Sequence, residues 1–460
     1  MHIWKTKRHR AFTGELNIAQ PFVGFNVLAP EFYRSAKPFV DMGPHAAIRI
    51  SESDGSTVGS DGWLTSGTGI ISYDTFAPNS WSSGDYTITH SGGGSLSINL
   101  PNGFTAPNFT ITDSVDRILF YVYGEVSSIS VKKNGETGYF TQSFLDRASK
   151  AKCVRFMDGT YTNEALSPDT EGLRTQSEGG LQWTHHGWTW DEIVQLSHEA
   201  QCDIWCNVHH LRYNDNTYLT NMANTLAGCY RNCYIEFSNE TWNSAFPVYS
   251  WIPTVAGGQN SAGWHADRSD IIAELFKGIS NKFIGVLGSQ AVGSGLFTTM
   301  VNNAVRPLNF IDVMAIAPYW GGTWSLNSSV STINSTSISD AVALFSSDFD
   351  TNWKPFIETW QSNCSGRGWG LVAYEGASHL HKFLNVNIPE EAEAHQKLLD
   401  INASQDMANL YNSILDWWNN LTNGGLFCHF ADVDYGVWGP KPTENTSTPR
   451  WNTLLNRMKN

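Results

Sequence analysis

Two glutamates stand where apolar runs of the sequence end in polar residues. Glu240 lies in YIEFSNETWN (234–243), directly after Asn239, and Glu375 lies in GLVAYEGASH (370–379). A carboxylate placed where a buried strand runs out is a candidate acid in catalysis. Two such strand-end glutamates predict a single barrel that carries both carboxyl groups at its mouth.

An alternation of apolar and amphipathic segments predicts the elements that position these glutamates. Eight apolar runs are typical of buried strands, and helical patterns separate most of them. A first helix is predicted from Pro30 through Met42, and Thr189 and Glu192 form a capping box that predicts another. Eight strand–helix units most simply close into an α/β fold, the (β/α)8 barrel. The predicted strands are 21–29, 153–159, 202–210, 234–240, 283–290, 311–320, 370–376 and 425–433.

Residues 70–137 interrupt this alternation. Their short alternating segments, separated by Gly, Asn, Pro and Ser, predict a small antiparallel β-sandwich inserted into the barrel. The chain then divides into an N-terminal arm (1–20), the start of the barrel (21–69), the insert and the remainder of the barrel (138–460). The insert is either a packing lid or spacer, or it is a sugar-binding module or a wall of the cleft, and its residues do not decide between these roles.

The two glutamate segments resemble the catalytic strands of glycoside hydrolase clan A, whose members carry an Asn-Glu pair after barrel strand four and a second Glu after strand seven. The resemblance covers Val23 to about Leu455 without the insert. The combination of RFMDG, EFSNETWN, APYWGG and AYEGASHL looks like an uncharacterised branch of the clan found in bacteria and bacteriophages. It implies that Glu240 is the general acid/base and Glu375 the nucleophile.

The resemblance also implies a set of substrate-binding residues. Asn239 matches the residue that bonds the sugar 2-hydroxyl, and Arg155 matches the strand-two arginine that supports the nucleophile's charge. Tyr319 matches a tyrosine that donates to the nucleophile. The remaining substrate-binding residues implied in this way are His209 or His210 after strand three, Trp320 beside Tyr319, and Trp438 as the floor of the subsite for the cleaved sugar.

The reaction that this pairing implies is hydrolysis of a β-glycosidic bond in a polysaccharide or oligosaccharide. One carboxyl group protonates the leaving oxygen, and the other supports an oxocarbenium-like transition state. Carboxyl groups about 5 Å apart favour a double displacement that retains the anomeric configuration. Neighbouring carboxylates also raise one pKa, which keeps an acid available near neutral pH. No cofactor is expected for this chemistry.

Composition argues against one class of partner and is compatible with carbohydrate. The net charge of −14 and the low isoelectric point argue against a nucleic-acid partner, because phosphate binding requires basic patches. The 19 tryptophans offer flat apolar faces that suit sugar rings, although most are expected in the core. No stretch is apolar enough for a membrane span or for a secretory signal, so a cytoplasmic or phage-associated enzyme is expected.

Several alternatives remain open from the sequence. One alternative is a catalytically silent barrel that binds carbohydrate or serves on a virion surface. Another is a metal-dependent hydrolase. Glu240 alone also fits an ordinary helix start, and Glu236 is more typical of a structural residue. The seven cysteines predict buried free thiols, while their two C-x-x-x-C spacings leave a weaker zinc alternative.

Overall fold

The computed structural model describes most of the chain with gaps, and the predicted arm at residues 1–20 lies outside the described part. The described residues are 22–28, 38–44, 48–50, 55–59, 63–74, 83–99, 108–111, 117–164, 175–176, 182–185, 187–434, 438–444 and 446–458.

Eight parallel strands close into a barrel, and all eight overlap the predicted strands. They are β1 (Val23–Asn26), β11 (Cys153–Arg155), β14 (Asp203–Val208), β15 (Cys233–Phe237), β16 (Phe283–Gly288), β17 (Val313–Ile316), β18 (Gly370–Ala373) and β19 (Phe427–His429). Close packing of the first strands requires a glycine, because a Cβ on Gly24 would lie 2.3 Å from the carbonyl oxygen of Cys153. The prediction of a (β/α)8 barrel is confirmed in its eight-stranded core.

The barrel strands are buried on both faces, which explains why they appear in the sequence as nearly continuous apolar runs. In β14 all six residues are buried. Trp205 points into a cluster inside the barrel, whereas Ile204 and Cys206 join the larger core between strands and helices. This alternation follows from the two-residue period of a strand.

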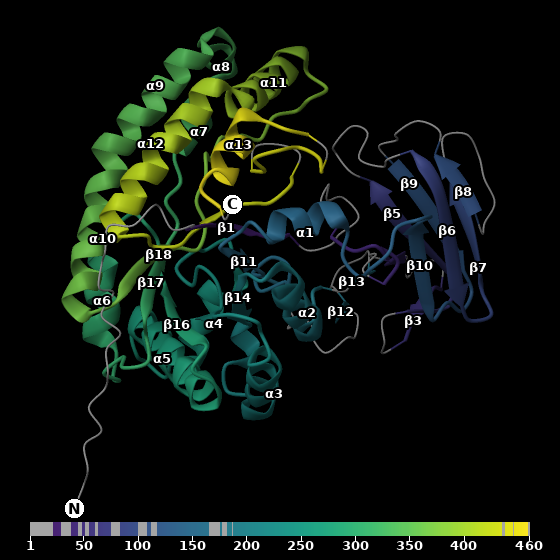
Figure 1. The fold of residues 1–460 in the computed structure, drawn as a ribbon, viewed down its shortest axis with the longest axis horizontal. Coiled ribbons are helices and arrows are strands. Elements are labelled where there is room, and N and C mark those ends of the chain that lie inside the picture. Colours follow the sequence, from purple (N-terminus) through teal and green to yellow (C-terminus); the bar gives the residue numbers. More distant parts are fainter. Residues whose placement is uncertain are drawn as a thin grey trace, which may run out of the picture.

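Helices surround the barrel (Figure 1). The capping box of α2 is confirmed, since Thr189 accepts from the Glu192 N–H and the Glu192 side chain accepts from the Thr189 N–H. The helices are α1 (Gln142–Ala148), α2 (Trp190–Ala200), α3 (Asn216–Leu226), α4 (Pro247–Val255), α5 (Ser261–Ile279), α6 (Gly295–Asn303), α7 (Gly322–Asn327), α8 (Val330–Ser335), α9 (Ile338–Asp348), α10 (Lys354–Arg367), α11 (Pro389–Ala403), α12 (Gln405–Thr422) and α13 (Pro449–Leu455).

The helix predicted from Pro30 through Met42 is wrong in its last part. Residues 29–37 lie outside the described part, but residues 38–42 are not helical. Phe39 instead pairs with Phe140 in an antiparallel bridge and packs 4.5 Å from the ring of Trp188. Contacts with residues distant in the sequence therefore outweigh the local helical pattern here.

Antiparallel strands form three further sheets, and one buried cluster, which includes Ile88, Phe109 and Phe120, joins residues of several of them. Their orders are β10-β6-β8, β12-β13-β2-β5-β9-β7 and β3-β4. The strands are β2 (Ile48–Ile50), β3 (Thr57–Val58), β4 (Leu64–Ser66), β5 (Thr68–Asp74), β6 (Gly84–Ser91), β7 (Ser95–Asn99), β8 (Asn108–Ile111), β9 (Arg117–Tyr123), β10 (Ser128–Lys133), β12 (Thr175–Gln176) and β13 (Gln182–His185).

These sheets extend beyond the predicted insert of residues 70–137. β2 pairs with β5 along residues 48–50, so residues assigned to the start of the barrel belong to the antiparallel part. β13, which follows barrel strand β11 in the chain, pairs with β2 from the other side. The predicted boundary at residue 70 lies inside β5, and strand pairing between distant segments leaves no local signal that would have placed it elsewhere.

The antiparallel strands lie to one side of the barrel, next to α1 (Figure 1). Asp41, in the segment after β1, bonds to β10 of the antiparallel part. Its carboxylate accepts hydrogen bonds from the Val131 N–H at 2.9 Å and from the Ser130 hydroxyl at 2.7 Å. Tyr139 donates to the Glu192 carboxylate at 2.5 Å, which fastens the chain after β10 to the start of α2.

All seven cysteines are free and buried, in agreement with the prediction. Among the described residues, no helix combines the length and the apolar character that a membrane crossing requires.

Candidate active site

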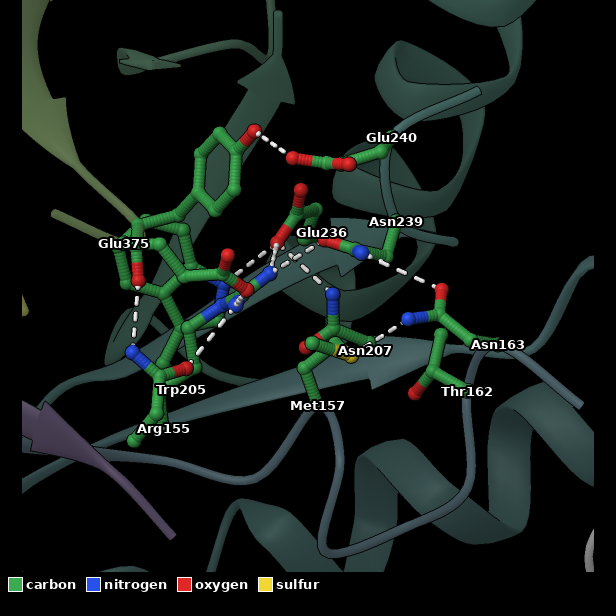
Figure 2. A network of polar contacts seen from close by, with 12 residues as sticks. Arg155, Met157, Thr162, Asn163, Trp205, Asn207, Glu236, Asn239, Glu240 and Glu375 are labelled. Carbon is green, nitrogen blue, oxygen red and sulfur yellow. Dashed lines mark hydrogen bonds and ion pairs between the residues drawn. The ribbon is translucent and has the colours of Figure 1, made fainter. Parts of the chain in front are cut away.

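A fully buried arginine joins the ends of four barrel strands (Figure 2). One terminal nitrogen of Arg155 donates to Asn26 Oδ1 at 3.0 Å and to Glu375 Oε1 at 2.9 Å. The other donates to Glu236 Oε2 and to Asn239 Oδ1, both at 2.9 Å. Asn26, Arg155 and Glu236 lie on β1, β11 and β15, while Asn239 and Glu375 follow β15 and β18. The planar fork of the guanidinium fixes these groups relative to one another.

Two aromatic rings flank the guanidinium of Arg155. Its central carbon lies 5.3 Å from the ring centre of Trp205 and 4.8 Å from that of Tyr374. Burial lowers the pKa of Arg155, but Glu236 and Glu375 more than offset this effect and raise it above its usual range. The arginine therefore stays cationic at the base of the site.

Glu375 is buried, and both of its carboxylate oxygens accept hydrogen bonds. Oε1 accepts from Arg155, and Oε2 accepts from the Tyr319 hydroxyl at 2.8 Å. Burial raises the pKa of Glu375 to about 7, with Arg155 acting against the shift and the charge of Glu240 adding to it. The structure thus holds this carboxylate in one orientation, close enough to Glu240 for the charge of Glu240 to act on it.

Glu240 lies across the site from Glu375 and is only half-buried. Its Oε1 accepts from the Tyr374 hydroxyl at 2.7 Å, and its Oε2 accepts from the Asn243 amide at 2.8 Å. The turn that presents it is unusual, because Ser238 and Glu240 both have positive φ angles, 56° and 42°. Such left-handed backbone in non-glycine residues often occurs at functional sites.

Glu236 is a third carboxylate beneath the site. Its Oε2 accepts from Arg155, from the Trp205 indole at 3.0 Å and from the Asn207 amide at 2.8 Å. Burial raises the pKa of Glu236, and Arg155 acts against the shift. Space for the side chain depends on Gly288 of β16, where a Cβ would lie 2.6 Å from Glu236 Oε1.

The two predicted histidines lie side by side after β14, with ring centres 4.3 Å apart. Nδ1 of His209 accepts from the Leu211 N–H, so Nε2 carries the proton and donates to the Glu164 carbonyl at 3.0 Å. Burial lowers the pKa of His209 to about 3 and that of His210 to about 4, so both rings are neutral near pH 7. His210 Nδ1 is buried without a hydrogen-bond partner in the described part of the chain.

The two predicted tryptophans have different environments. Trp320 is fully buried in the main core, with its ring 4.7 Å from that of Tyr411, and in this structure it exposes no surface to a substrate. It follows Tyr319 directly, and consecutive residues of an extended chain point to opposite sides. Trp438 is half-exposed, and its ring lies 5.9 Å from that of Tyr319. Tyr319 in turn donates a hydrogen bond to the predicted nucleophile, Glu375.

Several residues of the site were not singled out in the sequence. Tyr374 and Asn26 are both strand-end residues, and the placement rule that selected the glutamates would also have found them. Asn163 bonds the Asn239 amide at 3.2 Å but lies in a loop, where no comparable rule applies. His379, which stacks on Trp438, is likewise a loop residue.

Among the residues that the structure describes, no group of three or more His, Cys, Asp or Glu side chains is arranged to hold a metal ion. The C-x-x-x-C pairs are separate from the strand-end carboxylates, because Cys206 and Cys233 belong to the core between strands and helices.

No protein-family model matches the chain, and no curated protein matches it. Solved structures with a similar chain path include the α-L-arabinofuranosidase of Thermotoga maritima, at 11% identity and a TM-score of 0.43, over 69% of this chain and 63% of that one. A family 51 α-L-arabinofuranosidase of Bifidobacterium longum has 14% identity and a TM-score of 0.46, over 69% and 66%. Xylanase10C of Cellvibrio japonicus has 10% identity and a TM-score of 0.36, over 91% and 98%. The chain thus spans slightly less than two thirds of the two arabinofuranosidase chains, and at these identities the likeness concerns the fold alone.

Proposed function

We propose that this protein is a retaining glycoside hydrolase that cleaves β-glycosidic bonds in a polysaccharide or oligosaccharide. One observation carries this function: two carboxyl groups follow barrel strands β15 and β18, close enough for the charge of Glu240 to act on Glu375, and each has its own tyrosine donor, Tyr319 for Glu375 and Tyr374 for Glu240. Hydrolysis of a glycosidic bond requires two carboxyl groups placed in this way.

Glu375 is suited to act as the nucleophile. Its oxygens are held by Arg155 and Tyr319, so little motion is needed before one of them attacks the anomeric carbon. Positive charge from Arg155 also favours the ionised form that attack requires. The product of this step is a covalent glycosyl ester on Glu375, with the leaving sugar released as an alcohol.

Glu240 is suited to act as the acid and then the base. It is half-exposed, so it can exchange protons with water, and it lies on the other side of the site from Glu375 (Figure 2). It donates a proton to the leaving oxygen in the first step and removes one from the attacking water in the second. The water oxygen replaces Glu375 at the anomeric carbon, which restores the original configuration.

Glu375→Gln and Glu240→Gln proteins provide the test, with purified wild type on a panel of β-linked polysaccharides and aryl glycosides. Wild type should release product, and Glu375→Gln should lose at least about a thousandfold in kcat. Glu240→Gln should lose polysaccharide hydrolysis but still cleave aryl glycosides with strongly acidic phenols, which need no proton. Early products should retain the β configuration in NMR spectra.

Glu358→Gln is the matched control, because Glu358 is an exposed residue of α10, away from the strand ends. It should behave as wild type. A fully active Glu375→Gln protein would overturn the proposed function. Binding of a glycan without turnover by wild type would instead support a catalytically silent carbohydrate-binding barrel, whether free or on a virion.

A further inference from the structure

A row of rings begins at the hydrogen-bond partner of Glu375 and continues along the chain after β18. The ring of Tyr319 lies 5.4 Å from that of His379, and His379 lies 4.6 Å from Trp438 with an angle of 27° between the planes. His381 is nearly parallel to both, 6.3 Å from His379 and 6.1 Å from Trp438. Three flat rings therefore share nearly one orientation beside the candidate active site.

Phe383 extends this row to the surface. Its ring lies 4.5 Å from that of His381, at 86°. The side chain is 88% exposed, more than any other large apolar side chain in the described part of the chain. Tyr319, His379, His381, Phe383 and Trp438, here called the ring row, thus form a continuous path from Glu375 to solvent.

The two histidines of the ring row are suited to bind uncharged hydroxyl groups. Burial lowers the pKa of His379 to about 4, and burial also lowers the pKa of His381, so both are neutral at pH 7. Within the described residues, no protein group forms a hydrogen bond with either imidazole ring. Each imidazole ring therefore has one hydrogen-bond donor and one acceptor that no described protein group uses.

We propose that the ring row binds further sugar units of a polysaccharide chain whose scissile bond lies at Glu240 and Glu375. This inference rests on the proposed function and makes its substrate a polymer or long oligosaccharide. A chain of sugars presents apolar C–H faces and hydroxyl edges in alternation, which matches rings that combine flat faces with free polar atoms. A bound chain would also cover the exposed ring of Phe383.

The position of the ring row favours a glycan over a protein partner. It starts at Tyr319, whose hydroxyl holds Glu375, so a ligand on the row is continuous with a sugar at the site. A protein docked on Phe383 would not need contact with the half-buried rings of His379 and Trp438. A polysaccharide chain can follow the row inward.

The test compares His381→Ala, Phe383→Ala and Tyr230→Ala with wild type. Tyr230 is a matched exposed aromatic, 43% exposed, in the loop between α3 and β15 at the opposite end of the barrel. Substrates are oligosaccharides of increasing length from xylan, cellulose, mannan and galactan, and the corresponding aryl monosaccharide glycosides. Binding of the same oligosaccharides is measured by calorimetry in wild type and in the Glu375→Gln background.

Phe383→Ala and His381→Ala should each raise KM for long oligosaccharides about three- to tenfold, the effect of one lost ring contact, and weaken their binding by the same factor. Both should leave kcat and KM for aryl monosaccharide glycosides unchanged. Tyr230→Ala should change the kinetics and the binding of neither the long oligosaccharides nor the aryl glycosides. This dependence on chain length separates a binding role from general loss of structure.

Equal behaviour of Phe383→Ala, His381→Ala and wild type on long substrates would overturn the inference while leaving the proposed function intact. Binding of long oligosaccharides that depends on Phe383, without turnover by wild type, would support the inference and overturn the proposed function. Absence of any oligosaccharide binding to wild type would overturn the inference.

Discussion

At the scale of single residues, the site is governed by one buried cation among three carboxylates. Arg155 pairs directly with Glu236 and Glu375, and Glu240 adds a third negative charge nearby. One positive charge cannot balance three negative ones in a poorly solvated site. Burial raises the pKa of Glu375 most, Arg155 acts against this shift, and the charge of Glu240 adds to it.

This imbalance predicts the acidic limb of the pH profile. Glu375 must be ionised to attack, and its pKa in the free protein is raised to about 7, so kcat/KM should fall as the pH drops below about 7. Glu240→Gln removes one charge that raises this pKa, so the midpoint should move to lower pH. Initial rates on aryl glycosides with acidic phenols measure both midpoints, and an unchanged midpoint in Glu240→Gln would contradict the charge balance described here.

At the scale of elements, the site depends on close approach between neighbouring strands. Glu236 of β15 reaches Arg155 only because β16 has a glycine opposite its carboxylate. A glycine in an element is costly unless it provides space or a special backbone conformation. Gly288 lies beside Glu236, whereas Gly278 lies near the end of α5 with open space around it. Substitution of each glycine therefore separates the loss of space at the site from the general effect of glycine on stability.

Gly288→Ala should destabilise the protein by about 1–3 kcal/mol and lower kcat, because the new methyl group displaces Glu236 and so loosens Arg155. Gly278→Ala is the control. Nothing lies within 4 Å of its added Cβ, so it should stabilise α5 by about 0.5–1 kcal/mol without an effect on kcat. Urea unfolding and steady-state kinetics measure both effects. Wild-type kcat in Gly288→Ala would show that the Glu236 position is not needed.

At the scale of the whole molecule, the chain builds separate apolar cores. The barrel and its helices share a large core, while the antiparallel sheets enclose a smaller one that includes Phe109. Since the strand-end carboxylates belong to the barrel, we expect that removal of a side chain from the smaller core does not change the rate of their reaction.

Phe109→Ala should therefore lower the stability of the antiparallel part by about 3–5 kcal/mol and leave kcat unchanged for the folded protein. Phe276→Ala, an equally buried change in the barrel core, should reduce the stability of the barrel and the fraction of active protein together. Hydrogen exchange resolved by segment, combined with activity, measures the difference. A fall in kcat with Phe109→Ala would show that the two parts are coupled.

The sequence by itself determined the features that rest on local patterns. Apolar runs identified all eight barrel strands, because strands buried on both faces must be apolar along their length. The capping box at Thr189 was equally visible, since its two partners are three residues apart. The placement of Glu240 and Glu375 at strand ends also followed from such runs.

Only the tertiary structure decided which distant residues meet. Tyr319 and Trp320 are neighbours of similar type, yet one contacts Glu375 and the other packs in the core, because the face of each depends on how β17 meets β18. The pairing of β2 with β13 and the sharing of Arg155 between Glu236 and Glu375 join segments far apart in the chain. Such contacts follow from closure of the barrel and from strand register, which no local pattern encodes.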